Sequence, residues 1–336
     1  MRYGHSVAAV RRAEEALMAR LPEGALMQRA AAGLAAAGAD VLGRVYGARV
    51  VVLTGSGSNG GDALFAAARL LRRGAAGTAV LLAPERAHAA GLAAFRAAGG
   101  RVVGAADGPR AVAAADLVFD GITGIGGKGG LRPEAERLAA AAEHSPAAVL
   151  AVDLPSGVDA DTGEVTGPAV RADATVTFGT YKPGLLVDPA AERAGALRLV
   201  DIGLADELGA PELEALQHAD VAALLPRPGG ESDKYRRGVV GVAAGSEQYP
   251  GAAVLAVSGA LRGGAGAVRY SGPGAPPSWP RTPRRWSPPP ARTRRAGSRR
   301  GWSGPASATP RRRVPPSTRC SPPKCPRWST PTACAC

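Results

Sequence analysis

The chain has 336 residues, enough for two domains that each bury a core, and a formal net charge of +13. The charge is uneven: residues 272–336 contain 13 Arg, one Lys and no acidic residue, whereas residues 1–271 hold 27 basic and 28 acidic side chains. The nearly neutral body disfavours nucleic acid as the main ligand, and a nucleotide-binding protein whose basic tail grips nucleic acid is kept as an alternative.

The tail, residues 272–336, also differs in composition. It holds 16 of the 29 Pro, all four Trp and all four Cys, and it has neither Ile nor Leu. Because the tail has so few aliphatic side chains, burial of apolar surface cannot offset the conformational entropy lost on folding. The tail is therefore predicted to be disordered. The abrupt Arg, Pro, Ser, Ala and Gly bias is typical of GC-rich codons read out of frame. A frameshifted gene end and a genuine interaction arm are both kept as interpretations.

The cysteines do not indicate a metal site, because the spacings Cys320-x4-Cys325 and Cys334-x-Cys336 do not match a zinc ribbon. Without the tail the chain has no cysteine, which fits an intracellular protein. No apolar run approaches ~18 residues, and charges throughout the first turns argue against a signal peptide. The predicted location is the cytoplasm, with no membrane partner.

The first part of the chain, residues 5–46, predicts two helices separated at 21–26. From residue 49 onward, β-rich runs alternate with Ala-rich helical segments. The expected strands are 49–55, 78–83, 101–104, 116–122, 148–157, 172–179 and 196–203, and the expected helices are 62–73, 87–98, 108–115 and 133–143. This alternation predicts an α/β domain over 1–220, a Rossmann-like three-layer sandwich with a mostly parallel sheet.

A Pro-containing break at 224–238 separates a second βα start, with strands at 238–245 and 265–270 and a helix at 252–264. The segment 221–271 is too small to bury a core of its own. We therefore expect it to be the beginning of a truncated α/β unit, followed by the tail at 272–336.

The stretch "GSGSNGGDAL" follows the first strand and fits G-x-G-x-x-G at Gly55, Gly57 and Gly60. A redox fingerprint requires an acid at the end of the second strand, where Glu85 lies too far on. Asp62 is instead expected to cap the following helix, with the N–H groups of residues 58–61 facing a phosphate or another anion. A plain Gly-rich turn is the alternative.

A second loop, "DGITGIGGKGGLRP" at 120–133, has six glycines and Lys128 but no Walker A spacing. Lys128 is expected to donate a proton or hold a phosphate, and a solvated surface lysine is the alternative.

In the third loop, 152–167, Asp153 ends a strand and faces the expected cleft. Oxygen atoms of Asn59, Asp120 and Ser156 come from strand ends and are candidates to converge on one cation.

The fourth loop, "TFGTYKPGL" at 177–185, is interpreted mainly as a structural turn, with closure of the site by Lys182 as the alternative. The four histidines lie outside these loops. They are assigned no catalysis, which disfavours His-based acid–base chemistry and Ser-His-Asp hydrolysis.

Taken in order, "GSGSNGGDAL", "DGITGIGGKGG", "VDLPSGVDADTGEV" and "ATVTFGTYKPGL" closely resemble the NAD(P)H-hydrate epimerase domain. Residues 233–270 resemble the opening of the ADP-dependent NAD(P)H-hydrate dehydratase domain, which has a ribokinase-like fold. The pair is similar to the bacterial bifunctional repair enzymes, over about residues 5–271. A Rossmann-type NAD(P)-dependent oxidoreductase is the alternative enzyme.

The resemblance implies interconversion of the R and S forms of NADH or NADPH hydrated at C6 of the nicotinamide ring. In the family's second half, ADP or ATP supports removal of water from the S form; here the tail replaces the downstream nucleotide loops, so that activity is expected to be lost. The preference between NADH and NADPH and a homo-oligomeric state are left open.

The resemblance also assigns residues. The implied substrate contacts are Ser58, Asn59, Gly60, Gly61, Asp62, Gly124, Ile125, Gly126, Gly127, Lys128, Gly129, Gly130 and Asp153, with Ala252 in the second unit. A potassium ion is implied on Asn59, Asp120 and Ser156. Epimerisation requires the C6 hydroxyl to leave and return, or the ring to open. Asp153 is predicted as proton relay, and Lys128 as acid or electrostatic partner.

Overall fold

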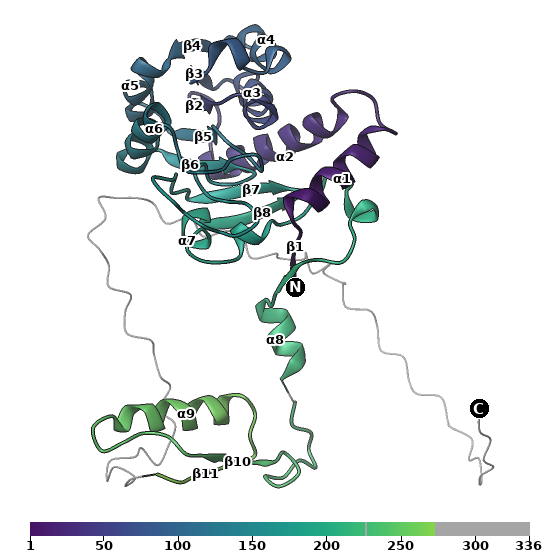
Figure 1. Cartoon of the computed structure of the whole chain (residues 1–336), viewed down its shortest axis with the longest axis vertical. Helices are drawn as coiled ribbons and strands as arrows, with labels where there is room; N and C mark the ends of the chain where they lie inside the picture. Colours follow the sequence, from purple (N-terminus) through teal and green to yellow (C-terminus); the bar gives the residue numbers. More distant parts are fainter. Residues whose placement is uncertain (226, 273–336) are drawn as a thin grey trace, which may run out of the picture. The chain divides into compact units, whose positions relative to one another are not determined.

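The computed structural model describes residues 1–225 and 227–272 (Figure 1). The predictions for the tail, namely disorder, a frameshift and the absence of a zinc site on its cysteines, lie outside the described residues beyond Gly272. Among the residues that the structure does describe, no helix has the length and apolarity needed to cross a membrane.

A seven-stranded sheet forms the centre of residues 49–200, in the order β4-β3-β2-β5-β6-β7-β8. All six neighbouring pairs are parallel. The strands are β2 (Arg49–Thr54), β3 (Ala76–Leu81), β4 (Arg101–Gly104), β5 (Leu117–Gly121), β6 (Ala148–Val152), β7 (Ala174–Phe178) and β8 (Ala196–Val200). The chain runs outward from β2 to β4 and then returns to place β5 on the other side of β2. The predicted parallel sheet is confirmed.

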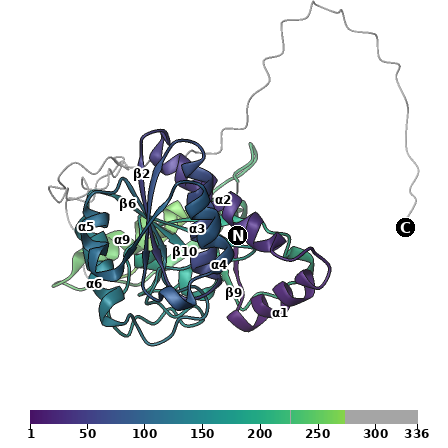
Figure 2. The same ribbon diagram turned by 90° about the horizontal axis from the view of Figure 1, so that it is seen from above.

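Helices cover both faces of this sheet, as Figures 1 and 2 show. Along β2, Val50 and Val52 pack in one hydrophobic cluster with α2 (Ala25–Leu42), α3 (Ser58–Leu71) and α4 (Ala89–Ala97). Val51 and Leu53 pack in a second cluster with α5 (Gly108–Ala113) and α6 (Pro133–His144). The alternation along the strand therefore builds the predicted three-layer sandwich.

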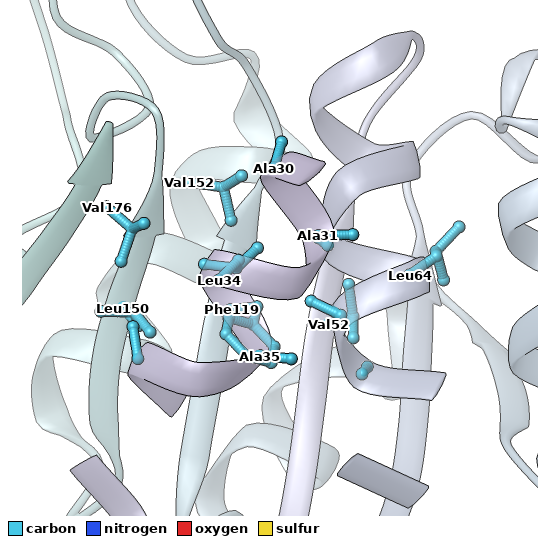
Figure 3. Packing of buried hydrophobic residues seen from close by; sticks show 14 of the residues in the cluster. Ala30, Ala31, Leu34, Ala35, Val52, Leu64, Phe119, Leu150, Val152 and Val176 are labelled. Atoms are coloured by element: carbon cyan, nitrogen blue, oxygen red, sulfur yellow. The ribbon is translucent and has the colours of Figure 1, made fainter. Parts of the chain in front are cut away.

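Small residues let α2 lie close to the sheet (Figure 3). Leu34 is fully buried and lies near Phe119 and Leu150 in this cluster. A Cβ built on Gly38 would come within 2.8 Å of the Phe119 ring, so this glycine is needed for the close approach. The Ala-rich sequence of this helix thus reflects packing distance as well as helix propensity.

The N-terminal segment contacts residues that lie about 170 to 210 positions later in the chain. Strand β1 (Arg2–Gly4) pairs antiparallel with β9 (Leu213–Ala215), and α1 (Val7–Met18) follows. His5 is buried, and its Nδ1 lies 2.7 Å from Thr180 Oγ1 in the β7 loop. The predicted pair of helices at 5–46 is confirmed, while this small sheet was missed because a three-residue strand has no readable period.

Ser6 caps α1, since its side chain accepts a hydrogen bond from the Ala9 N–H at 3.4 Å and donates one to Glu212 at 2.6 Å. We expect Ser6→Ala to lower the free energy of unfolding by about 0.5–2 kcal/mol, because first-turn donors of α1 lose their acceptor. Urea unfolding of the full chain measures the change in the free energy of unfolding. Ser145→Ala is unsuitable as a control, because the Ser145 hydroxyl also donates a hydrogen bond, to the Ala142 carbonyl. An unchanged midpoint would contradict the capping role.

The remaining elements are short. Helices α7 (Ala191–Ala194) and α8 (His218–Leu224) and the 3-10 turns η1 (Pro84–Arg86), η2 (Ala105–Asp107), η3 (Pro183–Leu185) and η4 (Ala205–Glu207) complete the first 225 residues. Residues 227–272 contain β10 (Val239–Val242), α9 (Pro250–Arg262) and β11 (Ala267–Tyr270), with the two strands parallel. The expected strand–helix–strand start is thereby confirmed.

Candidate active site

A cleft of ≈ 730 Å³ opens at the carboxyl edge of the large sheet. Its walls come from the loops that follow β2, β3, β5, β6 and β7, together with α1. The sheet order reverses between β2 and β5, and in open parallel sheets ligands bind outside the carboxyl ends of the strands at such a switch point. The position of the cleft is thus a consequence of strand order.

The loop after β2 is shorter than the sequence suggested. Helix α3 begins at Ser58, directly after Gly57, which has a φ of 119° and no side-chain cap. The prediction that Asp62 caps this helix is wrong, because the glycines that were assigned to the turn already form its first helical turn. Gly61 donates to the Gly57 carbonyl at 3.3 Å, so the N–H groups of residues 58–60 are the donors that helix geometry leaves free for an anion.

Glycines in this loop serve close packing. A Cβ built on Gly55 would lie 1.9 Å from the Ile122 carbonyl oxygen, so the β2 and β5 loops touch only because residue 55 is glycine. Similar clashes would occur at Gly60, with Thr54 at 2.9 Å, and at Gly61, with His88 at 2.8 Å. The cleft is lined by Ser58, Asn59 and Asp62 but not by Gly60 or Gly61.

The glycine-rich loop after β5 forms another wall. Gly124, Ile125, Gly126, Gly127, Lys128 and Gly130 line the cleft, whereas Gly129 does not. The Lys128 side chain is exposed and belongs to the same wall. Thr123 donates its N–H to Ser156 Oγ at 2.9 Å, which ties this loop to the one after β6.

Asp120 lies at the end of β5 and is fully buried. Its two carboxylate oxygens accept the Ser156 hydroxyl at 2.6 Å and the Ser156 N–H at 2.8 Å. Burial raises the pKa of Asp120 to about 6, although the bonds from Ser156 lower it. The structure therefore joins two of the three predicted cation ligands directly.

The third predicted ligand, Asn59, lies against the same loop: a Cβ built on Gly124 would be 3.1 Å from Asn59 Oδ1. In the described residues no cluster of three His, Cys, Asp or Glu side chains suits a metal. A monovalent cation takes hydroxyl, carbonyl and amide oxygens instead, and these are what Asn59, Thr123 and Ser156 offer around a single carboxylate.

Three buried polar atoms without a hydrogen-bond partner occur in the described residues, and all lie between residues 54 and 62: Thr54 Oγ1, Asn59 Nδ2 and Asp62 Oδ1. Buried polar groups in native proteins are nearly always paired, and the exceptions call for a ligand, an ion or a water. Two of the three atoms belong to residues that line the cleft, namely Asn59 and Asp62, so this wall has polar atoms available for a ligand.

Asp153 and Lys182 form a buried ion pair in the cleft. Lys182 is 1% exposed, and its ammonium donates to Asp153 Oδ1 at 2.5 Å, to Thr177 Oγ1 at 3.0 Å and to the Phe178 carbonyl at 3.1 Å. Asp153 has a φ of 67°, a left-handed conformation that is unusual for a residue other than glycine. The predicted turn is confirmed, because Lys182 directly precedes the 3-10 turn η3. Lys182 also lines the cleft, and closure of the site by this residue stays a prediction.

Two further carboxyl groups line the cleft near this pair. Burial raises the pKa of Asp62 well above its usual value, and the charges of Asp153 and Glu14 raise it further. Glu14, on α1, also has a raised pKa, mainly through burial, and Lys182 acts in the opposite direction. The sequence predicted a helix here, and the helical pattern carried no signal for a role of Glu14 in the cleft.

Comparison with known proteins agrees with this architecture. The family described as YjeF-related protein N-terminus matches residues 23–184. An NAD(P)H-hydrate epimerase of Microbacterium testaceum is 44% identical over 236 residues, which cover 68% of this chain and 89% of that protein. The chain belongs to the NAD(P)H-hydrate epimerase family.

Longer members of the epimerase family are similar as well. A bifunctional NAD(P)H-hydrate repair enzyme of Mycobacterium leprae is 52% identical over 276 residues, covering 81% of this chain. This chain spans 56% of the length of that relative.

The crystal structure of yeast YNL200c aligns with a TM-score of 0.48 and 21% identity, covering 55% of this chain and 83% of that one.

The family match contains every predicted site residue except Ala252, which is exposed on α9 and does not line the cleft. Glu14 and Arg11 lie outside the match but line the cleft. In this epimerase-family chain the site therefore includes an N-terminal helix that precedes the matched segment.

Proposed function

We propose that this chain interconverts the R and S forms of NADH or NADPH hydrated at C6 of the nicotinamide ring. The observation that carries the proposal is the buried Asp153–Lys182 pair in a cleft at the switch point of the sheet. Membership of the epimerase family supports the reaction, and the free N–H groups at the start of α3 suit the pyrophosphate of a dinucleotide.

The reaction must break and remake the bond between C6 and its hydroxyl, or open the ring. In the first case the ring nitrogen supplies electrons to form an iminium ion, and an acid and a base assist the departing and returning water. Asp153 is the base in this proposal, because Lys182 compensates its negative charge inside the protein. Lys128, exposed in the glycine loop, is a candidate for the substrate's phosphates.

A potassium ion is proposed on Asn59, Asp120 and Ser156. The fit rests on Asp120, a fully buried carboxyl whose hydrogen bonds come from Ser156 and Ile122 and not from a basic side chain. A bound cation would compensate this charge and hold the ends of β5 and β6 together. We do not propose for this chain the ADP- or ATP-dependent dehydration that the sequence resemblance implies for the family's second half.

The test follows the R and S forms of hydrated NADH by chromatography with the full chain, with and without potassium. We expect the two forms to equilibrate without a net change in redox state, and we expect the rate to fall when sodium or choline replaces potassium. No conversion under either condition would defeat the proposal, and a net redox change would favour an oxidoreductase.

A further inference from the structure

Asp62 is a buried carboxyl group of the cleft that forms no ion pair with a basic side chain in the described residues. Its side chain is 9% exposed, it lines the cleft, and its Oδ1 has no hydrogen-bond partner in the described residues. If the carboxylate were ionised, its Oδ1 would lose its hydration without receiving a hydrogen bond in return, which costs free energy. The geometry therefore favours the protonated form of Asp62 over the ionised form.

The neighbouring charges act in the same direction. The buried ammonium of Lys182 is already engaged by Asp153, Thr177 and the Phe178 carbonyl. Asp153 and Glu14 both disfavour a second negative charge on Asp62 and raise its pKa beyond the effect of burial. The other charged or titratable groups that line the cleft or pack against α3 are Arg11, Arg86, Lys128, Arg132, Glu134 and His88.

Asp62 and Asp153 reach the cleft from different sides. Asp62 lies on α3 after β2, and Asp153 follows β6, while β5 lies between these strands in the sheet. A planar ring placed over the end of β5 would thus have a carboxyl group available on either side. One of the two is paired with an ammonium, and the other is not.

We propose that Asp62 is the catalytic acid of the epimerisation and acts on the face of the nicotinamide ring opposite to Asp153. This inference rests on the proposed function and adds a residue and a stereochemical role to it. It also replaces Lys128 as the proton donor.

The Asp62 carboxyl gives its proton to the C6 hydroxyl, the C6–O bond breaks, and water leaves, while the lone pair of N1 forms the N1=C6 bond of the iminium ion. Water then adds to the opposite face of C6, the π electrons return to N1, and the released proton goes to Asp153. The reverse reaction uses the same two groups with their roles exchanged, as microscopic reversibility demands.

A pair of carboxyl groups with opposite protonation states is the arrangement by which inverting glycosidases attack from the face opposite to departure. The C6 centre of the hydrated ring resembles a glycosidic carbon, because an adjacent heteroatom stabilises the cation. Inversion at C6 is the outcome that such a pair would produce.

The experiment compares Asp62→Asn with wild type in the full chain, and Asp40→Asn serves as a matched control because Asp40 is exposed and paired with Arg198 outside the cleft. We expect Asp62→Asn to slow R to S conversion by at least about a hundredfold, the usual contribution of a general acid. Binding of NADPH, used as the probe, should change by less than about threefold, because the amide keeps the size of the side chain. Asp40→Asn should match wild type.

A second variant tests the role through pH. Wild-type turnover should fall as alkaline pH removes the proton from Asp62, and Glu14→Gln should move this limb to lower pH, because it deletes a negative charge that raises the pKa of Asp62. Near-normal turnover of Asp62→Asn would overturn the inference. If that variant does not fold, an unmoved alkaline limb in Glu14→Gln would overturn it instead. A wild-type chain that does not epimerise at all defeats the proposed function.

Discussion

Asp153→Asn is expected to abolish epimerisation, with a loss of at least about a hundredfold, while the chain stays folded. The amide retains the oxygen that accepts from Lys182, Thr177 and the Phe178 N–H, so the β7 loop keeps its anchor. What is lost is the group that accepts the proton, together with the negative charge that compensates the Lys182 ammonium. Chromatographic turnover and circular dichroism of the same sample measure both properties, and near-normal turnover would refute the role.

The reciprocal change, Lys182→Met, should affect stability as well as turnover. It leaves the Asp153 carboxylate in the protein without its ammonium, and removing one partner of a buried ion pair lowers the free energy of unfolding by about 3–5 kcal/mol. Asp153 is 7% exposed and Lys182 is 1% exposed, so solvent cannot replace the lost interaction fully.

The double variant Asp153→Asn and Lys182→Met, compared with the two single variants, gives the interaction energy of the ion pair itself. Because neither charge remains, its loss of stability should be smaller than the sum of the two single losses by about 1–3 kcal/mol. Urea unfolding of the four proteins gives this coupling energy. Additive losses would show that the two side chains contribute independently.

Much of the fold follows from local pattern. The β-rich runs of the sequence became β2 to β8 because alternate residues such as Val50 and Val51 face two different helix layers. The placement of Asp153 in the cleft, and of the buried Asp120 at the same edge of the sheet, also followed, since carboxyl ends of parallel strands share one edge. These inferences need only the period of the strands and the rule of parallel sheets.

Other features depend on tertiary contacts that no local pattern encodes. The start of α3 was misplaced because glycines, which favour turns by propensity, form a helical turn where Gly60 and Gly61 pack too closely for any other residue. Lys182 is paired with a residue 29 positions earlier in the chain. Glu14 enters the cleft through long-range contacts of the N-terminal segment, such as the pairing of β1 with β9 and the contact of His5 with Thr180.

Asp120 is expected to make the stability of the chain depend on pH in a particular direction. Burial raises its pKa from 3.8 to about 6, so the folded state holds the proton more tightly than the unfolded chain. Its contribution is therefore fully present below about pH 4 and is lost as the pH rises through about 6, by about 3 kcal/mol in total without potassium.

Asp120→Asn provides the matched measurement, because it removes this titration and leaves the other carboxyl groups in place. Between about pH 4 and pH 8 in a choline buffer, the free energy of unfolding of wild type should fall by about 3 kcal/mol relative to that of Asp120→Asn. Potassium should reverse this loss at the higher pH in wild type alone, because a cation that binds the folded state stabilises it by mass action. A difference that does not vary with pH would contradict the burial argument. An equal response of both proteins to potassium would place the cation elsewhere.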